Sequence, residues 1–246
     1  MRLISLISID STNTHAQRLI REGLTENSLI YSSEQTKGRG QRGKDWLSRP
    51  GDGIYCSYVY FQQHLLVSHQ FVFNMAMATA VAEFVSSKIS EEVKIKWPND
   101  ILVNKKKIAG LLIENSIKGE SITVSVVGIG VNLNQIGELQ DFETKGTSMK
   151  AETGDNYPYE TAVFELANFV KIAKAEFDSG DYESIIRKYH SYLYQNQKEI
   201  QLRLADNSNT TVILEGVNAD GSLSVLAEGK SINYFHPQAR ICVTHS

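Results

Sequence analysis

The chain has few of the residues that build disulfide frameworks and metal centres. It contains 2 cysteines and 6 histidines among 246 residues. Cys56 and Cys242 each lie in an apolar, strand-like run, which favours two buried small side chains over a bridge. The histidines are scattered without the spacing of metal ligands, so the sequence gives no reason to expect a zinc site.

The sequence also lacks long apolar runs and a large net charge of either sign. No stretch approaches the ~20 apolar residues that span a membrane, and the N-terminus lacks a charged region followed by an apolar core. The net charge of −3 and the pI near 6.1 provide no general attraction for nucleic acid. We therefore expect a globular, cytoplasmic protein that binds neither membrane nor DNA.

The densest group of polar residues lies between two apolar runs. Residues 96–100 read Lys-Trp-Pro-Asn-Asp, and Lys107 follows seven residues later. The runs 93–95 and 111–113 are typical of buried strands, so the polar residues lie at strand ends. A carboxylate there can hold a divalent cation, and a lysine on the next strand can hold the anion that this cation also touches. The alternative is a hairpin with a solvated, charged turn at 104–106, and this pattern alone favours neither.

A second segment combines glycines with cations. Residues 38–44 read Gly-Arg-Gly-Gln-Arg-Gly-Lys, and Trp46 closes the segment. Glycines let a backbone approach a ligand, and the cations offset the charge of an anion. The spacing matches neither a Walker loop nor a dinucleotide fingerprint. A flexible basic surface loop would not explain Trp46, which is available to stack on a base, so the segment is interpreted as an anion-binding loop.

Hydrophobic periodicity predicts an α+β fold. Strands are expected at 3–9, 30–33, 54–61 and 122–127, and helices after Ser11 and at 71–89, 162–177 and 182–193. Beyond about Gln195 the chain predicts five short strands at 200–204, 210–216, 222–226, 231–234 and 240–244. We therefore expect a large domain over residues 1–194 and a small β-barrel over residues 195–246.

Five blocks of the chain together resemble the biotin protein ligases, which activate biotin with ATP and attach it to a lysine of a carrier domain. The blocks occur in the family's order and approximate spacing, at residues 11–13, 38–46, 96–100, 107–114 and 128–134. The resemblance implies a mixed-sheet catalytic domain of the biotin/lipoate ligase type and an SH3-like C-terminal barrel. The chain departs from the family at Gln41, where arginine is common, and this departure removes a formal charge.

The resemblance also implies roles for individual residues. Lys107 is the expected catalytic cation, and Arg39 is expected to order the loop over the adenylate. The expected biotin-binding residues are Ser11, Thr12, Asn13, Gln35, Gly38, Arg39, Lys107 and Gly110. The expected ATP and adenylate contacts are Arg39, Gly40, Gln41, Arg42, Lys44, Trp46, Asn99, Lys107 and Asn132. Asp100 is the expected magnesium ligand.

Substrates and partners follow from the same resemblance. ATP with magnesium and biotin are the expected small molecules, a biotin carboxyl carrier protein is the expected partner, and the enzyme is expected to be a monomer or a homodimer. Because the Ser11 block begins ten residues from Met1, we expect the monofunctional class without an N-terminal DNA-binding domain. Two alternatives are a lipoate or octanoate ligase and a biotin- or nucleotide-binding regulator without turnover. The presence of Lys107 and Asp100 argues against the regulator.

Overall fold

The computed structural model describes residues 1–47, 49–137, 139–140 and 145–243. The chain forms two compact units, and neither is one continuous stretch. The first unit comprises Met1–Gln70, Ile108–Leu139 and Thr147–Asn168. The second comprises Phe71–Lys107, Gln140–Gly146 and Phe169–Ser246.

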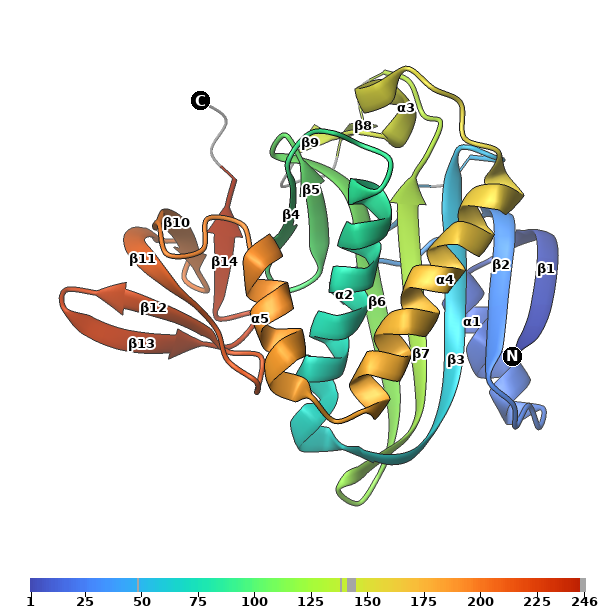
Figure 1. The fold of residues 1–246 in the computed structure, drawn as a ribbon, viewed down its shortest axis with the longest axis horizontal. Coiled ribbons are helices and arrows are strands. Elements are labelled where there is room, and N and C mark those ends of the chain that lie inside the picture. The colour runs from blue at the N-terminus through green and yellow to red at the C-terminus, as the bar shows by residue number, and fades with distance from the viewer. Residues whose placement is uncertain (48, 138, 141–144, 244–246) are drawn as a thin grey trace. The chain divides into compact units, whose positions relative to one another are not determined.

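The first unit is built on strands in the order β1-β2-β3-β7-β6 (Figure 1). Their bounds are Arg2–Ile9 for β1, Ser28–Gln35 for β2, Gly53–Leu66 for β3, Ser121–Asn132 for β7 and Lys106–Lys118 for β6. β1 runs parallel to β2, and the other neighbours are antiparallel. The same unit contains the short helices η1 (Gln41–Gly43), η2 (Val67–His69) and α3 (Met149–Thr153), and the first part of α4 (Tyr159–Asp178).

Helix α1 (Thr12–Arg21) packs on this sheet through a buried apolar cluster. Ala16 of α1 meets Ile30 of β2, Val59 of β3 and Val126 of β7 in that cluster. Burying apolar side chains between a helix and a sheet fixes the position of the helix on the sheet. The N-terminus of α1 is therefore held over strands β2, β3 and β7, where several predicted site residues lie.

The second unit contains helix α2 (Gln70–Ser86), which is apolar on nearly every side. Phe73 and Phe84 of α2 make edge-on ring contacts with Phe177 and Phe169 of α4. β4 (Val93–Lys96) and β5 (Asp100–Val103) form an antiparallel pair, and α5 (Tyr182–Tyr192) is followed by the backbone bridge between Leu193 and Ile95. Two short strands, β8 (Leu139–Gln140) and β9 (Lys145–Gly146), pair with each other.

The C-terminal part of the second unit is an antiparallel sheet with the strand order β13-β12-β11-β10-β14. Its strands are β10 (Glu199–Leu204), β11 (Asn209–Val217), β12 (Leu223–Ala227), β13 (Lys230–Tyr234) and β14 (Ala239–Cys242). These are the five strands predicted after Gln195, although Thr244 of the last prediction lies outside the described residues. The α+β class with a mixed sheet and a small C-terminal β-structure is confirmed. The domain boundary between residues 194 and 195 stays a prediction.

The strand predicted at 122–127 is longer than expected, and the helix predicted at 71–89 ends earlier. β7 continues to Asn132 because its glycines stay in the ladder, and α2 ends at Ser86.

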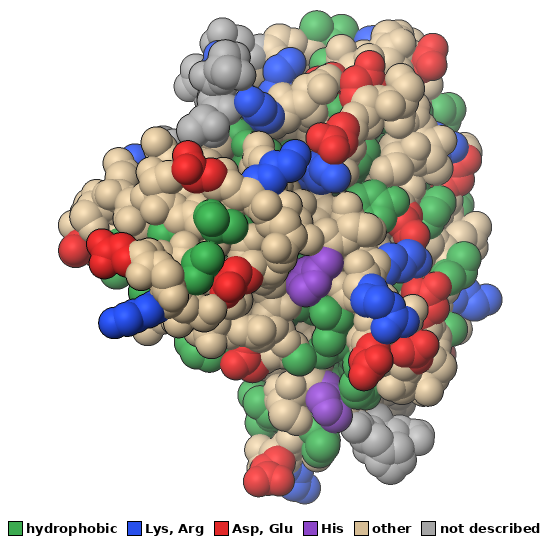
Figure 2. All heavy atoms as spheres, turned by 60° about the vertical axis from the view of Figure 1, so that its left-hand side comes forward, with side chains coloured by type: hydrophobic (Ala, Val, Ile, Leu, Met, Phe, Trp, Pro, Cys, Tyr) green, Lys and Arg blue, Asp and Glu red, His purple; other side chains and the backbone are tan. Residues whose placement is uncertain are grey.

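Cys56 and Cys242 are free cysteines, and burial raises the pKa of the Cys56 thiol. Acidic and basic side chains are interspersed on the face in Figure 2. In the described part of the chain, no helix is long and apolar enough to cross a membrane.

Candidate functional site

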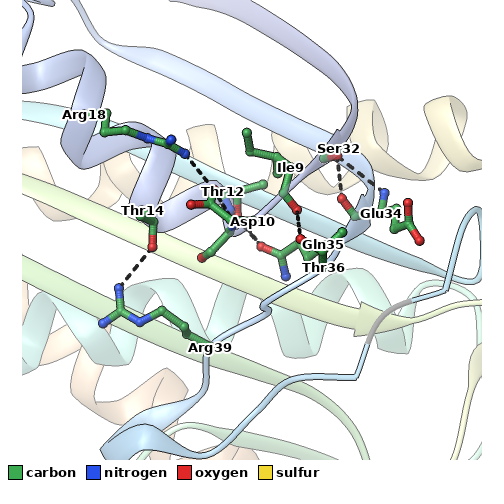
Figure 3. A network of polar contacts seen from close by, with 11 residues as sticks. Ile9, Asp10, Thr12, Thr14, Arg18, Ser32, Glu34, Gln35, Thr36 and Arg39 are labelled. Carbon is green, nitrogen blue, oxygen red and sulfur yellow. Dashed lines mark hydrogen bonds and ion pairs between the residues drawn. The ribbon is translucent and has the colours of Figure 1, made fainter.

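The Ser-Thr-Asn block lies where β1 gives way to α1. Ser11 is the N-cap residue, but its side chain makes no capping hydrogen bond. The cap comes from the next strand instead, because Gln35 Oε1 accepts the backbone N–H of Thr12 at 2.8 Å (Figure 3). The parallel pairing of β1 with β2 brings Gln35 opposite Ile9 and so places it beside the helix start. A simple N-cap uses the side chain of the N-cap residue itself, whereas here a side chain of a neighbouring strand binds the start of the helix.

A buried serine extends this contact into a network. Ser57 Oγ of β3 lies 2.8 Å from Thr12 Oγ1 and 2.6 Å from Asn13 Oδ1. Thr12 Oγ1 is also 3.1 Å from Gln35 Oε1. The sequence interpretation missed Ser57, and its only local signal is a hydroxyl within the apolar run of β3.

The network ends at a carboxylate that holds the expected catalytic arginine. Asn13 Nδ2 donates to Glu114 Oε2 at 2.8 Å and to the Leu112 carbonyl at 3.2 Å. The guanidinium of Arg39 lies 2.9 Å from Glu114 Oε1. It also lies 3.4 Å from Thr14 Oγ1, a contact that Figure 3 shows. Glu114 was part of a recognised block but had no predicted role. The structure thus joins Thr12, Asn13 and Gln35 to Arg39 through two residues that sequence reasoning did not assign.

The glycine-rich loop is folded back on itself. Trp46 N–H donates to the Gly38 carbonyl at 2.9 Å, and Gly40 N–H donates to the Lys44 carbonyl at 2.7 Å. A Cβ at Gly38 would lie 2.3 Å from the Trp46 carbonyl, so the turn requires glycine there. These two N–H groups are used within the loop and hold its two ends together. Gln41 is half-buried in η1, and the side chain of Arg42 lies outside the described part of the structure.

Two glycines of β7 make room for site side chains. A Cβ at Gly128 would lie 2.3 Å from Asn13 Oδ1, and one at Gly130 would lie 2.5 Å from Trp46 Cε2. Both glycines stay in regular antiparallel register, with Gly130 opposite the predicted Gly110. Neither glycine lies in a bulge, so close approach by Asn13 and Trp46 is the reason for glycine at both positions.

Asn132, at the end of β7, is engaged at both ends of its side chain. Its Nδ2 donates to the Thr147 carbonyl at 2.9 Å, and its Oδ1 accepts from Gln135 Nε2 at 3.3 Å. The amide thereby ties the end of β7 to the segment before α3. Its expected contact with a nucleotide stays a prediction.

The remaining predicted residues lie in the second unit. Lys107 Nζ is 3.0 Å from Asp100 Oδ1. Asn99, which directly precedes Asp100 in the chain, is buried. The turn between β5 and β6 has positive φ at Asn104 (48°) and Lys105 (64°), so the hairpin alternative describes the backbone correctly. The hairpin also brings the charged side chains of Lys107 and Asp100 together as an ion pair.

Trp97, in the turn of residues 96–100, has a structural role. It is buried, and its Nε1 donates to the Gly221 carbonyl at 3.0 Å. Its ring also contacts His236, with centroids 5.4 Å apart. These contacts attach the 96–100 turn to the five-stranded sheet of the same unit.

Asp100 would supply one carboxylate to a divalent cation. Among the described residues, no group of three or more His, Cys, Asp or Glu side chains could hold a metal ion. A single carboxylate fits magnesium that arrives with substrate phosphates, because such an ion keeps waters and needs only one or two protein ligands. The donor set does not fit a resident transition metal.

Comparisons with known proteins agree with this architecture. The chain matches the Biotin/lipoate A/B protein ligase family over residues 5–132. It is 30% identical to a biotin–[acetyl-CoA-carboxylase] ligase of Paracoccus denitrificans, over 89% of this chain and 91% of that protein. It is 24% identical to the bifunctional ligase/repressor BirA of Escherichia coli (strain K12), over 90% of this chain and 68% of that protein.

Of two further matches, one spans less than half of the related protein, and the other is a solved structure with the same fold. The bifunctional ligase/repressor BirA of Bacillus subtilis is 30% identical over 60% of this chain, and the match spans 46% of that protein. The solved structure of a biotin protein ligase from Aquifex aeolicus, in complex with biotin and ATP, superposes with a TM-score of 0.80 at 23% identity and covers 99% of both chains. This last likeness concerns the fold. On the sequence match to the family and the Paracoccus relative, the chain belongs to the biotin/lipoate A/B protein ligase family.

Proposed function

We infer that this protein is a biotin protein ligase, which forms biotinyl-5′-adenylate from biotin and ATP and then transfers biotin to a lysine of a carrier protein. The observation that carries this inference is the 30% identity to a biotin–[acetyl-CoA-carboxylase] ligase along 89% of the chain. The buried polar network at the start of α1 supports it, because biotin has a polar ureido ring at one end. Biotin and ATP are the substrates.

The reaction has two steps. The biotin carboxylate attacks the α-phosphorus of ATP, and pyrophosphate leaves. The amine of a carrier lysine then attacks the acyl carbon of the adenylate, loses a proton, and displaces AMP. Both steps gather negative charge on oxygen atoms around phosphorus, so positioning and electrostatic stabilisation by cations are the principal contributions of the protein.

In the first unit, we propose that Thr12 and Gln35 receive the ureido ring, with Ser11, Asn13, Gly38 and Gly110 around them. Trp46 is proposed to stack on adenine, and Asn132, Gly40 and Gln41 to complete the nucleotide contacts. Arg39, with Arg42 and Lys44, supplies positive charge to the loop. The ion pair between Arg39 and Glu114 at 2.9 Å supports this role, because a guanidinium that pairs with a carboxylate can also pair with a substrate carboxylate or phosphate.

In the second unit, Lys107 is proposed to stabilise the negative charge on phosphate oxygens, and Asn99 to contact the nucleotide. Asp100 is proposed to hold magnesium, which would neutralise phosphate charge when bound. The ion pair at 3.0 Å supports both roles, because it orients the two side chains until substrates compete for both groups.

Further proposals concern the protein's surroundings. The acceptor is a biotin carboxyl carrier protein or domain, in line with the name of the Paracoccus relative. Location in the cytoplasm, a monomer or homodimer, and the absence of DNA binding stay predictions. No observation favours lipoate or octanoate, since the Paracoccus relative and the Aquifex aeolicus structure are named as biotin ligases.

Pyrophosphate exchange into ATP tests the function directly. Exchange should depend on biotin and be negligible with lipoate or octanoate, because a site with buried hydrogen-bonding groups rejects a ligand without partners by ~10⁴-fold or more. Mass spectrometry of a carrier domain incubated with the protein, ATP, magnesium and biotin should show one added biotinyl group. Comparable exchange with all three acids, or a preference for lipoate, would overturn the assignment to biotin.

A further inference from the structure

We propose that Gln135 is a positioning residue for nucleotide selection. It holds the Asn132 amide so that the amide oxygen meets the amine of adenine and rejects a carbonyl at the same place. This proposal rests on the biotin ligase function, in which Asn132 contacts the nucleotide, and deepens it by naming what selects ATP. Gln135 acts through Asn132 and does not itself need to touch the base.

Strand β7 places Asn132 beside the position proposed for adenine. Successive side chains of a strand point to opposite faces, so residues 130 and 132 share a face. Trp46, which is proposed to stack on adenine, lies against Gly130, where a Cβ would be 2.5 Å from Trp46 Cε2. Two residues of a strand span about 7 Å. The edge of a base stacked on Trp46 is therefore within reach of Asn132, which is only partly buried.

The hydrogen bonds of Asn132 fix the orientation of its amide. Its Nδ2 donates to the Thr147 carbonyl at 2.9 Å, and a carbonyl oxygen can only accept. Its Oδ1 accepts from Gln135 Nε2 at 3.3 Å. An amide turned over by 180° would set its oxygen against the Thr147 carbonyl and its NH₂ group against the NH₂ group of Gln135. Both contacts therefore favour the same orientation.

Gln135 supplies the second of two restraints on this amide. The terminal torsion of asparagine has a broad energy well, so one hydrogen bond lets the amide pivot, whereas contacts at both ends fix its plane. Gln135 is itself held in place, because it is only 8% exposed and its backbone carbonyl accepts from Ser148 Oγ at 2.6 Å. Ser148 also caps α3 by accepting the N–H of Ala151 at 3.1 Å. The helix start thus anchors Gln135, and Gln135 anchors Asn132.

The remaining groups of Asn132 are complementary to adenine. A primary amide has two N–H donors and an oxygen with two lone pairs. The contacts in the described structure use one N–H and one lone pair, and so leave one donor and one acceptor for a ligand. Adenine has an amine beside a ring nitrogen that accepts, and this edge pairs with both groups of an amide. Because ATP is the proposed substrate, the amide oxygen is the group that meets the amine.

The chemical consequence is selectivity for an amine over a carbonyl on the purine ring. Inosine triphosphate has a carbonyl where ATP has its amine, so its oxygen would face the oxygen of Asn132. An amide held at both ends cannot turn to relieve this repulsion. Without the contact to Gln135, the amide can pivot on the Thr147 carbonyl and move its oxygen away. Inosine triphosphate is therefore the matched probe, because it differs from ATP only in the base.

The first experiment measures biotin-dependent pyrophosphate exchange with ATP and with inosine triphosphate. Gln135→Met keeps the length of the side chain and removes its donor. Its preference for ATP, as the ratio of the two kcat/KM values, should fall about tenfold, through KM for ATP more than through kcat. Asn134→Ala is the control, because the Asn134 amide binds the carbonyls of Gly51 and Tyr157 in the same segment, at 3.2 and 2.9 Å. This variant should lose stability and keep the wild-type preference.

A pH series with Gln135→Glu separates positioning from a structural role. The new carboxyl group can donate to Asn132 only when it is protonated, and burial raises the pKa of a carboxyl group. The preference for ATP should therefore be low at about pH 8 and rise toward the wild-type value as the pH falls to about 5.5. The wild-type ratio should stay level, because an amide does not titrate. If circular dichroism shows Gln135→Met to be poorly folded, this series carries the test, because it compares one variant with itself.

A double-mutant cycle shows whether Gln135 acts through Asn132. Asn132→Ala removes the amide that Gln135 is proposed to hold. Adding Gln135→Met to Asn132→Ala should therefore leave the ratio of the two kcat/KM values unchanged. A further fall of the ratio in the double variant would show that Gln135 acts on the nucleotide by another route.

The outcomes separate this proposal from the proposed function. An unchanged preference in Gln135→Met, an equal loss in Asn134→Ala, or a ratio independent of pH in Gln135→Glu overturns the role of Gln135 and leaves the biotin ligase function intact. Absence of biotin-dependent exchange in the folded wild-type protein overturns the function, and with it this proposal. A loss that is confined to the Gln135 variants, recovers at low pH in Gln135→Glu and disappears in the Asn132→Ala background supports both.

Discussion

Lys107 Nζ lies 3.0 Å from Asp100 Oδ1, and the pair joins neighbouring segments across the turn that contains Asn104 and Lys105. The side chains of Lys107 and Asp100 are 16% and 22% exposed, so the pair is only partly screened by water. Each group therefore helps to orient the other.

Lys107→Ala should lower both adenylate formation and biotin transfer by ~100-fold or more, or at least ~2.7 kcal/mol of transition-state stabilisation. The physical reason is that both steps gather charge on oxygen atoms that the lysine is proposed to stabilise. Single-turnover measurements of each step test this. Lys106→Ala is the matched control, because consecutive strand residues point to opposite faces. Near-normal rates for Lys107→Ala would remove it from the catalytic machinery.

Asp100→Asn should raise the magnesium concentration needed for half-maximal adenylate formation by ~10-fold or more, about 1.4 kcal/mol, because it removes the one proposed carboxylate ligand. Initial rates at saturating ATP over a magnesium series measure this. Glu92→Gln is the control, since Glu92 also pairs with a lysine, Lys94 at 3.0 Å, but on the surface. An unchanged magnesium dependence would show that Asp100 serves only to hold Lys107.

Glu114→Gln should loosen the glycine-rich loop in the ligand-free protein. The neutral amide binds Arg39 less strongly than the carboxylate does, so trypsin should cut after Arg39, Arg42 or Lys44 more quickly. Biotin with ATP should restore protection, because the adenylate supplies an anion. Mass spectrometry of timed digests identifies the cuts. Glu26→Gln, which alters a surface pair with Arg2 at 3.6 Å, is the control. Equal loop cleavage in both variants would contradict the role of Glu114.

Gly130→Ala should weaken ATP binding and destabilise the protein by about 1–3 kcal/mol, the cost of overpacking. The new methyl would lie 2.5 Å from Trp46 Cε2, so the indole must leave its place on β7. Urea unfolding and ATP titration measure the two effects. In the Trp46→Ala background, Gly130→Ala should cost much less stability, since the clashing atoms are gone. An equal cost in both backgrounds would show that the strain arises elsewhere.

Local pattern was sufficient to locate much of the fold and several of the candidate residues. Alternating apolar residues predicted the strands, because side chains on a strand must alternate between core and surface. The polar residues 96–100 fell at strand ends because they interrupt apolar runs. Gly38 was recognised in a glycine-rich segment, and its close contact with the Trp46 carbonyl gives the physical reason.

The sequence by itself determined the α+β architecture, the order of the motifs and the types of side chain available, because these depend on neighbours along the chain. Only the tertiary structure decided which of them meet. Ser57 is 44 residues from Asn13, and Asn13 is 101 residues from Glu114, yet they are hydrogen-bonded. Such contacts depend on the register of β3, β7 and β6 and on the packing of α1 against them. No local pattern encodes that register, so these contacts could be identified only in the folded chain.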